Sequence, residues 1–190
     1  MPEIVGPPRY LRHMTSNPEE IRTERLVLRR VGPGDLRAAI AVLSDPETSH
    51  HDQSGKPSAA ETADLLARWR AHWVHEGVGY WAVVLPETGE VIGFGGLHHH
   101  ELDGERTLNL SYRLRPRHRG RGYAPEMARA AVEWARRERP HRPVVIITDP
   151  GDKPSQRVAE KLGFAHVGAG VTAEGPVLVH RRQGVVAMTA

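Results

Sequence analysis

Alternating and helical patterns of apolar residues mark out two elements in the middle of the chain. Residues 107–114 alternate between polar and apolar side chains, which is the period-two pattern of a half-buried strand. From Tyr123 onward, apolar residues recur at helical spacing as far as Trp134, and Pro125 stands in the first turn, where a missing N–H is tolerated. The arginine- and glycine-rich segment Arg117–Ala124 therefore joins a strand to the start of a helix.

The same patterns predict further elements on both sides of this unit. They are a helix that follows Asp35, a helix that begins with a capping box at Ser58–Glu61, strands at 80–85 and 91–97 joined by a hairpin turn, a buried strand at 144–148, a helix capped by Ser155 that ends at Gly163, and strands near 164–167 and 177–182. A polar turn is expected over 101–106. The strands from 80 to 114 then form an antiparallel meander.

Composition is that of a single globular domain. The chain has 190 residues, 39% of them hydrophobic, and four tryptophans, which is enough for one core. The absence of cysteine excludes a disulfide framework and a catalytic thiolate. No apolar run approaches the roughly 20 residues that a membrane helix needs, and a signal-peptide core is absent, so we expect a soluble, cytoplasmic protein without membrane partners.

Proline content and charge refine this outline. Residues 1–22 contain four prolines and little periodicity, so we expect an extended or partly disordered N-terminal arm. The single domain is expected over 23–182, followed by a C-terminal tail at 183–190. The 26 Lys and Arg residues exceed the 23 Asp and Glu residues by only three, and the charges are intermixed, so we do not expect nucleic-acid binding.

The glycine-rich segment has the features of an anion site. Gly120 and Gly122 let the backbone approach an anion closely, and the first-turn N–H groups and the dipole of the following helix favour negative charge there. The neighbouring arginines add positive charge, although a solvated basic turn has the same composition. The third glycine of the Rossmann fingerprint and the Gly-Lys-Ser/Thr ending of the phosphate loop are both absent. We therefore expect a pyrophosphate-containing cofactor, and neither dinucleotide binding nor nucleotide hydrolysis.

Read as Arg-x-x-Gly-x-Gly between a strand and a helix, Arg117–Gly122 resembles the acyl-CoA-binding motif of the GCN5-related N-acetyltransferase (GNAT) superfamily. Thr23–Arg29 resembles the opening strand of the subgroup that includes the ribosomal-protein N-terminal acetyltransferases. Later blocks are similar in the same order, at Gly93–Leu97, Leu110–Leu114, Gly122–Glu126 and Ser155–Phe164. The resemblance covers about Thr23 to Arg182.

This resemblance implies a mixed α/β fold with a mostly antiparallel sheet of about seven strands and flanking helices. The strands at 107–114 and 144–148 would splay apart and hold acyl-CoA, with acetyl-CoA as the cosubstrate. The residues implied to bind it are Tyr112, Arg113 and Leu114 along the pantetheine arm, Arg117, Arg119, Gly120, Arg121, Gly122, Tyr123 and Ala124 at the phosphates, and Asp152 and Ser155 on the following helix.

The expected general base is missing from its usual position. Asn109 stands where many relatives carry a glutamate, and an amide cannot accept that proton, so the base lies elsewhere, the amine arrives neutral, or Asn109 is simply a surface residue of the strand. His98, His99 and His100 are the nearest candidates, because imidazole titrates near neutral pH. Alternation places His98 and His100 on one face, while the whole triplet also fits an exposed strand end. Three consecutive histidines cannot easily direct their rings at one ion, so no metal site is expected.

The expected general acid is missing as well. Ala159 occupies the position at which many relatives carry a tyrosine, and Asp152-Lys153-Pro154-Ser155 replaces an Asn-x-x-Ser signature. Ser155 is a candidate hydrogen-bond partner for the departing thiolate, although a serine before a helical run also serves as an N-cap. Asp152 likewise fits a turn residue.

The function expected from the resemblance is N-acetyl transfer, an acyl transfer of a group other than aminoacyl. The acetyl group would pass directly from the thioester to a primary amine, either a protein N-terminus or a small-molecule amine. His50, His51 and Asp52, in the polar segment between the first two helices, are the expected acceptor contacts. The alternative is a non-catalytic acyl-CoA sensor, because Asn109 and Ala159 replace two chemical groups. A homodimer is common in the resembled family.

Overall fold

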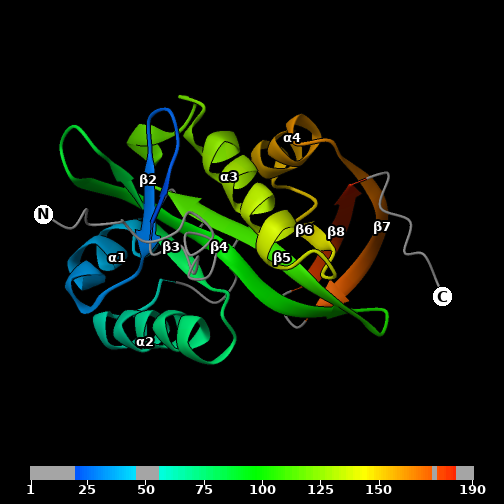
Figure 1. The fold of residues 1–190 in the computed structure, drawn as a ribbon, viewed down its shortest axis with the longest axis horizontal. Helices are drawn as coiled ribbons and strands as arrows, with labels where there is room; N and C mark the ends of the chain where they lie inside the picture. Colours follow the sequence, from blue (N-terminus) through cyan, green and yellow to red (C-terminus); the bar gives the residue numbers. More distant parts are fainter. Residues whose placement is uncertain (1–19, 46–55, 173–174, 183–190) are drawn as a thin grey trace, which may run out of the picture.

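A computed structural model describes residues 20–45, 56–172 and 175–182 (Figure 1). The expected C-terminal tail and most of the expected N-terminal arm lie outside these ranges. The elements, in chain order, are β1 (Glu20–Arg22), β2 (Val27–Arg30), the 3-10 turn Pro33–Asp35, α1 (Leu36–Leu43), α2 (Ala59–His75), β3 (Tyr80–Leu85), β4 (Glu90–Leu102), β5 (Glu105–Leu114), the 3-10 turn Pro116–His118, α3 (Tyr123–Glu138), β6 (Val144–Thr148), α4 (Lys153–Lys161), β7 (Phe164–Thr172) and β8 (Gly175–Arg182).

The strands form one eight-stranded sheet in the order β1-β2-β3-β4-β5-β6-β8-β7. All neighbours are antiparallel except β5 and β6, which run parallel. The mixed, mostly antiparallel sheet expected from the sequence is confirmed. Its eighth strand is β1, which comes from the last three residues of the segment expected as an arm and pairs with β2.

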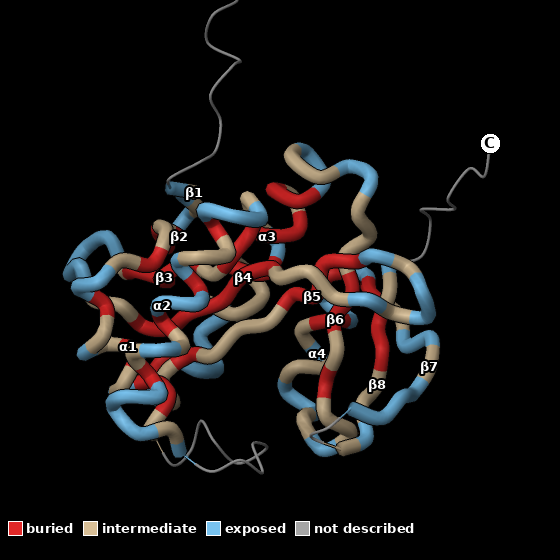
Figure 2. Tube along the Cα trace, turned by 90° about the horizontal axis from the view of Figure 1, so that it is seen from below, coloured by how far each residue is buried: buried red, intermediate tan, exposed pale blue. Residues whose placement is uncertain are grey.

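Both faces of the sheet are covered by helices. One group of buried side chains joins α1 and α2 to Ala82 and Phe94, which are paired across β3 and β4. A larger group on the opposite face joins α3 and α4 to Trp81 and to Leu110 of β5. Figure 1 shows α1 and α2 together, away from α3 and α4, and Figure 2 shows buried positions along the central strands and exposed ones along the edge strand β7.

The parallel pair β5 and β6 separates almost at once. Its ladder has only two register pairs within the described residues, Leu108 with Val144 and Asn109 with Val145. Beyond Asn109 the strands diverge, which confirms the splay expected from the family resemblance. The N–H of Leu108 donates to the Pro143 carbonyl at 2.8 Å, so its backbone groups face β6. Because backbone groups alternate sides along a strand, those of Tyr112 and Leu114 also face the gap.

Two local predictions need correction. The strand expected to end at Leu97 continues to Leu102, so the histidine triplet lies within β4, and the turn shrinks to Asp103–Gly104. Both turn residues have positive φ, 52° and 79°, as a tight two-residue hairpin requires. The cap of α4 is Asp152, whose Oδ1 accepts from the Ser155 N–H at 3.0 Å, so Ser155 lies inside the first turn.

The capping box of α2 is present as predicted, with the Ser58 side chain accepting from the Glu61 N–H. The aromatic face of α2 packs inward: Trp69 stacks on Tyr80, with ring centroids 4.6 Å apart, and Trp73 packs edge-on against Trp81. These contacts fix α2 against the strand that leads to the site. In the part of the chain that the structure describes, no helix has the length and apolar character to cross a membrane.

Candidate active site

The glycine loop before α3 presents its backbone outward. Gly120 and Gly122 have φ of 72° and 83°, in the left-handed region that favours glycine, and Gly122 is the N-cap of α3. Within the described ranges, no acceptor lies in hydrogen-bonding position to the backbone N–H groups of 120–124. With the helix dipole behind them, these N–H groups can hold a phosphate group.

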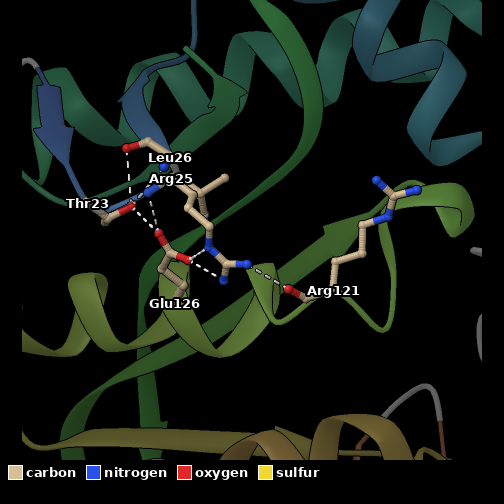
Figure 3. A network of polar contacts seen from close by, with 5 residues as sticks. All are labelled: Thr23, Arg25, Leu26, Arg121 and Glu126. Carbon is tan, nitrogen blue, oxygen red and sulfur yellow. Dashed lines mark hydrogen bonds and ion pairs between the residues drawn. The ribbon is translucent and has the colours of Figure 1, made fainter. Parts of the chain in front are cut away.

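The arginines of the loop differ in their surroundings. The Arg117 guanidinium pairs with the Glu90 carboxylate at the β3–β4 hairpin, and Arg115 reaches the same Oε1 at 3.2 Å. Burial opposes ionisation of Glu90, but hydrogen bonds from Arg117 and His118 lower its pKa overall. Arg117 therefore shares the single negative charge of Glu90 with Arg115, whereas the Arg121 side chain extends away from Arg25 and Glu126 (Figure 3).

A further group of residues contacts this loop and was missed by the sequence analysis. Arg25, in the turn between β1 and β2, donates to the Arg121 carbonyl at 3.0 Å and forms a two-point ion pair with Glu126 of α3 (Figure 3). Thr23 donates from its hydroxyl to Glu126 Oε1 at 2.6 Å. The sequence places these residues in blocks similar to the family, but nothing local signals that the two blocks meet.

Tyr112 and Ser155 meet across the gap between β5 and α4. The Tyr112 hydroxyl donates to Ser155 Oγ at 3.4 Å. Burial raises the pKa of Tyr112 to about 12, outweighing the opposing effect of the hydrogen bond to Ser155. The phenol therefore stays protonated through the physiological pH range. The Arg113 side chain lies on the opposite face, since Arg113 pairs with Phe94.

Asn109 lies where β5 and β6 part. Its Oδ1 accepts from the Ile147 N–H of β6 at 3.2 Å, and its Nδ2 donates to Ser111 Oγ at 3.3 Å. The residue is only 8% exposed. The side chain thus supplies β6 with an acceptor at a point where the β5 backbone has moved out of reach, which gives Asn109 a place in the framework of the gap.

His98 pairs with Asn109 across β4 and β5, and its Nε2 lies 3.5 Å from Asn109 Nδ2. Its ring lies nearly parallel to that of Tyr80, with centroids 6.2 Å apart. Burial lowers the pKa of His98 to about 4, assisted by the nearby His100 and His72. The imidazole is therefore neutral at pH 7. As the alternation predicts, His99 pairs with Leu108 and lies on the opposite face.

The expected acceptor contacts His50, His51 and Asp52 lie outside the described residues. A surface cavity of about 580 Å³ is lined by Ala41 and Asp45 and by residues 115–117. Among the described residues, no cluster of three or more His, Cys, Asp or Glu side chains is arranged to hold a metal ion.

The arrangement suits a long ligand with phosphates at one end and amides along its length. The N–H groups of 120–124 can bind an anion, the Tyr112 and Leu114 backbone edge can offer strand-like hydrogen bonds, and Ser155 lies across the gap from Tyr112. Coenzyme A thioesters have this chemistry. The residues present therefore fit acetyl-CoA, which would supply an activated acetyl group in the gap.

Comparisons with known proteins identify relatives of the same kind. Residues 25–165 match the family model of the acetyltransferase (GNAT) domain. The chain is 28% identical over 162 residues to the uncharacterized protein YkkB of Bacillus subtilis (strain 168), covering 85% of this chain and 94% of YkkB. A solved acetyltransferase from Agrobacterium tumefaciens (strain C58) is 31% identical, with a TM-score of 0.73 over 87% of this chain and 94% of that one.

RimL, a ribosomal alpha-N-protein acetyltransferase solved in complex with coenzyme A, has the same fold. It is 18% identical, with a TM-score of 0.74 over 86% of this chain and 97% of that one. Since the family model spans most of the sequence, the chain belongs to the GNAT acetyltransferase family and is an N-acetyltransferase with acetyl-CoA as its cosubstrate.

Proposed function

We propose that this N-acetyltransferase moves the acetyl group directly from acetyl-CoA to a primary amine that enters from the α1 and α2 face of the sheet. The observation that carries the proposal is the splay beyond Asn109, where the backbone edge of Tyr112 and Leu114 faces a gap that leads to the loop at 120–124. This arrangement supports a thioester held along β5 with its phosphates at α3.

The side chains on the acceptor face favour an amine that binds in its neutral form. Asn109 cannot accept a proton, and His98, with a pKa of about 4, is a weak base. An amine that loses one proton before binding needs neither group as a base for its attack. As the C–N bond forms and the C–S bond breaks, its second proton passes to the departing thiolate, which leaves the amide and the CoA thiol. The reaction rate should then rise with pH until the amine itself is fully deprotonated. His98 would orient the amine, since a ring nitrogen of the neutral imidazole can accept an N–H hydrogen bond without taking the proton.

The departing thiolate would be stabilised from the opposite face. The Tyr112 hydroxyl and Ser155 Oγ form a hydrogen-bonded pair at the N-terminal turn of α4. A phenol with a pKa of about 12 donates without ionising, and the helix N-terminus favours negative charge. This pair takes the place of the tyrosine that many relatives carry at the position of Ala159.

A protein N-terminus and a small-molecule amine are the two acceptor classes that we propose. The fold likeness to RimL, an alpha-N-protein acetyltransferase, supports the first class. His50, His51 and Asp52 stay the predicted acceptor contacts. The cytoplasmic location and the homodimer also stay predictions.

The direct test is turnover of acetyl-CoA with a panel of amines, including peptides with free N-termini. Two variants of Gly120 provide a matched pair, because no atom lies within 4 Å of a Cβ built at this glycine and both new side chains have the same size. Gly120→Asn tolerates the positive φ and should retain turnover, whereas Gly120→Asp places a carboxylate at the phosphate site and should abolish it.

The panel also separates the enzyme from the non-catalytic alternative. Binding of acetyl-CoA without turnover of any amine would favour an acyl-CoA sensor and contradict the proposed acyl transfer. Equal turnover by the two Gly120 variants would contradict the assignment of the phosphate site.

A further inference from the structure

The turn between β1 and β2 holds the phosphate loop and the start of α3 together. Glu126 accepts four hydrogen bonds from this turn: the backbone N–H of Arg25 at 2.9 Å, Arg25 Nε at 2.8 Å, Arg25 Nη2 at 2.6 Å and the Thr23 hydroxyl at 2.6 Å (Figure 3). The Arg25 guanidinium also lies over the Tyr123 ring, 4.9 Å from its centroid. These contacts link residues that are about one hundred positions apart in the sequence.

The position of Glu126 at the start of α3 explains why its charge is paired with Arg25. Glu126 lies in the first turn of α3, where a carboxylate suits the helix dipole but opposes a second anion bound at the same end. Its side chain is only 14% exposed, so solvent screens it weakly. Burial disfavours its charged form, yet the hydrogen bonds from Thr23 and Arg25 lower its pKa overall. Arg25 therefore compensates a negative charge that would otherwise repel a phosphate.

Arg25 also sets the direction of a peptide group in the loop. Its Nη1 donates to the Arg121 carbonyl at 3.0 Å. In a trans peptide the carbonyl and the following N–H point in opposite directions, so the N–H of Gly122 is turned away from the Arg25 guanidinium. With φ of 83° at Gly122, this peptide has few other restraints on its orientation.

We propose that Arg25 is a positioning residue of the cofactor site, which cancels the charge of Glu126 and aims the Gly122 N–H at the cofactor phosphates. This inference rests on the proposed placement of acetyl-CoA at the loop. It extends the site to a segment that has no contact with the reacting atoms, and it gives the Thr23-Glu24-Arg25 block a physical role in cofactor binding.

The test compares two acetyl donors, one with and one without the phosphates. Replacing Arg25 by methionine keeps the length of the side chain but leaves Glu126 without its ion pair. The value of kcat/KM for acetyl-CoA should fall roughly tenfold or more, mainly through KM, because a poorly screened carboxylate now faces the phosphates. The value of kcat/KM for S-acetylpantetheine, which has no pyrophosphate, should be unchanged.

A second substitution distinguishes the effect of the Glu126 charge from a general loss of structure. Adding Glu126→Gln to Arg25→Met removes the unpaired charge, so the double variant should bind acetyl-CoA more tightly than Arg25→Met alone. Arg136→Met is the matched control, because Arg136 forms a similar ion pair with Glu133 on the exposed side of α3 and should leave both kcat/KM values unchanged. If Arg25→Met does not fold, Arg25→Gln carries the same comparison, because a neutral amide also removes the positive charge beside Glu126 Oε2 but can still donate a hydrogen bond.

The outcomes are distinct. Equal loss with both donors, no loss with either, or a double variant that binds no better than the single one would overturn the role of Arg25. A wild-type protein that turns over neither donor would instead contradict the proposed acyl transfer, and the calorimetric affinity of Arg25→Met for acetyl-CoA would still decide the role of Arg25.

Discussion

Replacing Asn109 by alanine should destabilise the protein by loosening the point where β5 and β6 part. The variant leaves the Ile147 N–H without the acceptor that now lies 3.2 Å away, in a region where Asn109 itself is 8% exposed. An unsatisfied buried N–H costs about 1–3 kcal/mol. For a domain of this size, that loss lowers the melting temperature by roughly 2–12 °C.

Thermal and urea unfolding of matched variants measures this effect. Ser111→Ala is the control, because it removes the other well-placed partner of the Asn109 amide and leaves the bond to Ile147 intact. Asn109→Ala should therefore lose more unfolding free energy than Ser111→Ala, and acetyl-CoA should bind it more weakly because the gap is less well fixed. An Asn109→Ala protein as stable as the Ser111→Ala protein would refute the idea that this side chain holds β6 in place.

Three further predictions concern Tyr112, His98 and Gly96. Tyr112→Phe should lower kcat roughly tenfold with little change in the KM of acetyl-CoA, which steady-state kinetics would show, because in the proposed mechanism the hydroxyl stabilises the departing thiolate. The depressed pKa of His98 means that the unfolded chain takes up a proton first, so the free energy of unfolding should fall as the pH drops from 6.5 to about 4; His98→Gln should flatten this dependence in urea titrations. Gly96→Ala should cost roughly 1–3 kcal/mol in the same assay, because a Cβ there would collide with the Gly79 backbone, whereas Gly34→Ala, with no atom within 4 Å, should be nearly neutral.

Features that depend on neighbouring residues could be read from the sequence. The capping box at Ser58, the alternation along 107–114 and the helix after Gly122 were all predicted close to their observed positions. Errors occurred where two local interpretations were equally good. Both Asp152 and Ser155 can cap a helix, and the polar histidines after Leu97 fit either the exposed end of a strand or its continuation into a longer strand.

The arrangement of side chains in the site was harder to predict from the sequence. Asn109 could be interpreted only as a departure from the general base of relatives, because its bond to Ile147 joins residues 38 positions apart. The contact between Tyr112 and Ser155 spans 43 positions and depends on the distance between β5 and the start of α4. The pKa of His98 depends on burial that the bare triplet does not reveal.

Most of the helices and strands, the loop that can hold an anion and the family resemblance could be predicted from the sequence alone. These properties follow from periodicity, caps and glycine positions, which act over a few residues. Which groups face the gap, how the charge of Glu126 is compensated and how far the His98 ring is enclosed were settled by the three-dimensional packing. Those outcomes depend on how strands pair and diverge and on contacts between segments that are far apart in the sequence. Many different sequences share the same local pattern, so the pattern does not specify these contacts.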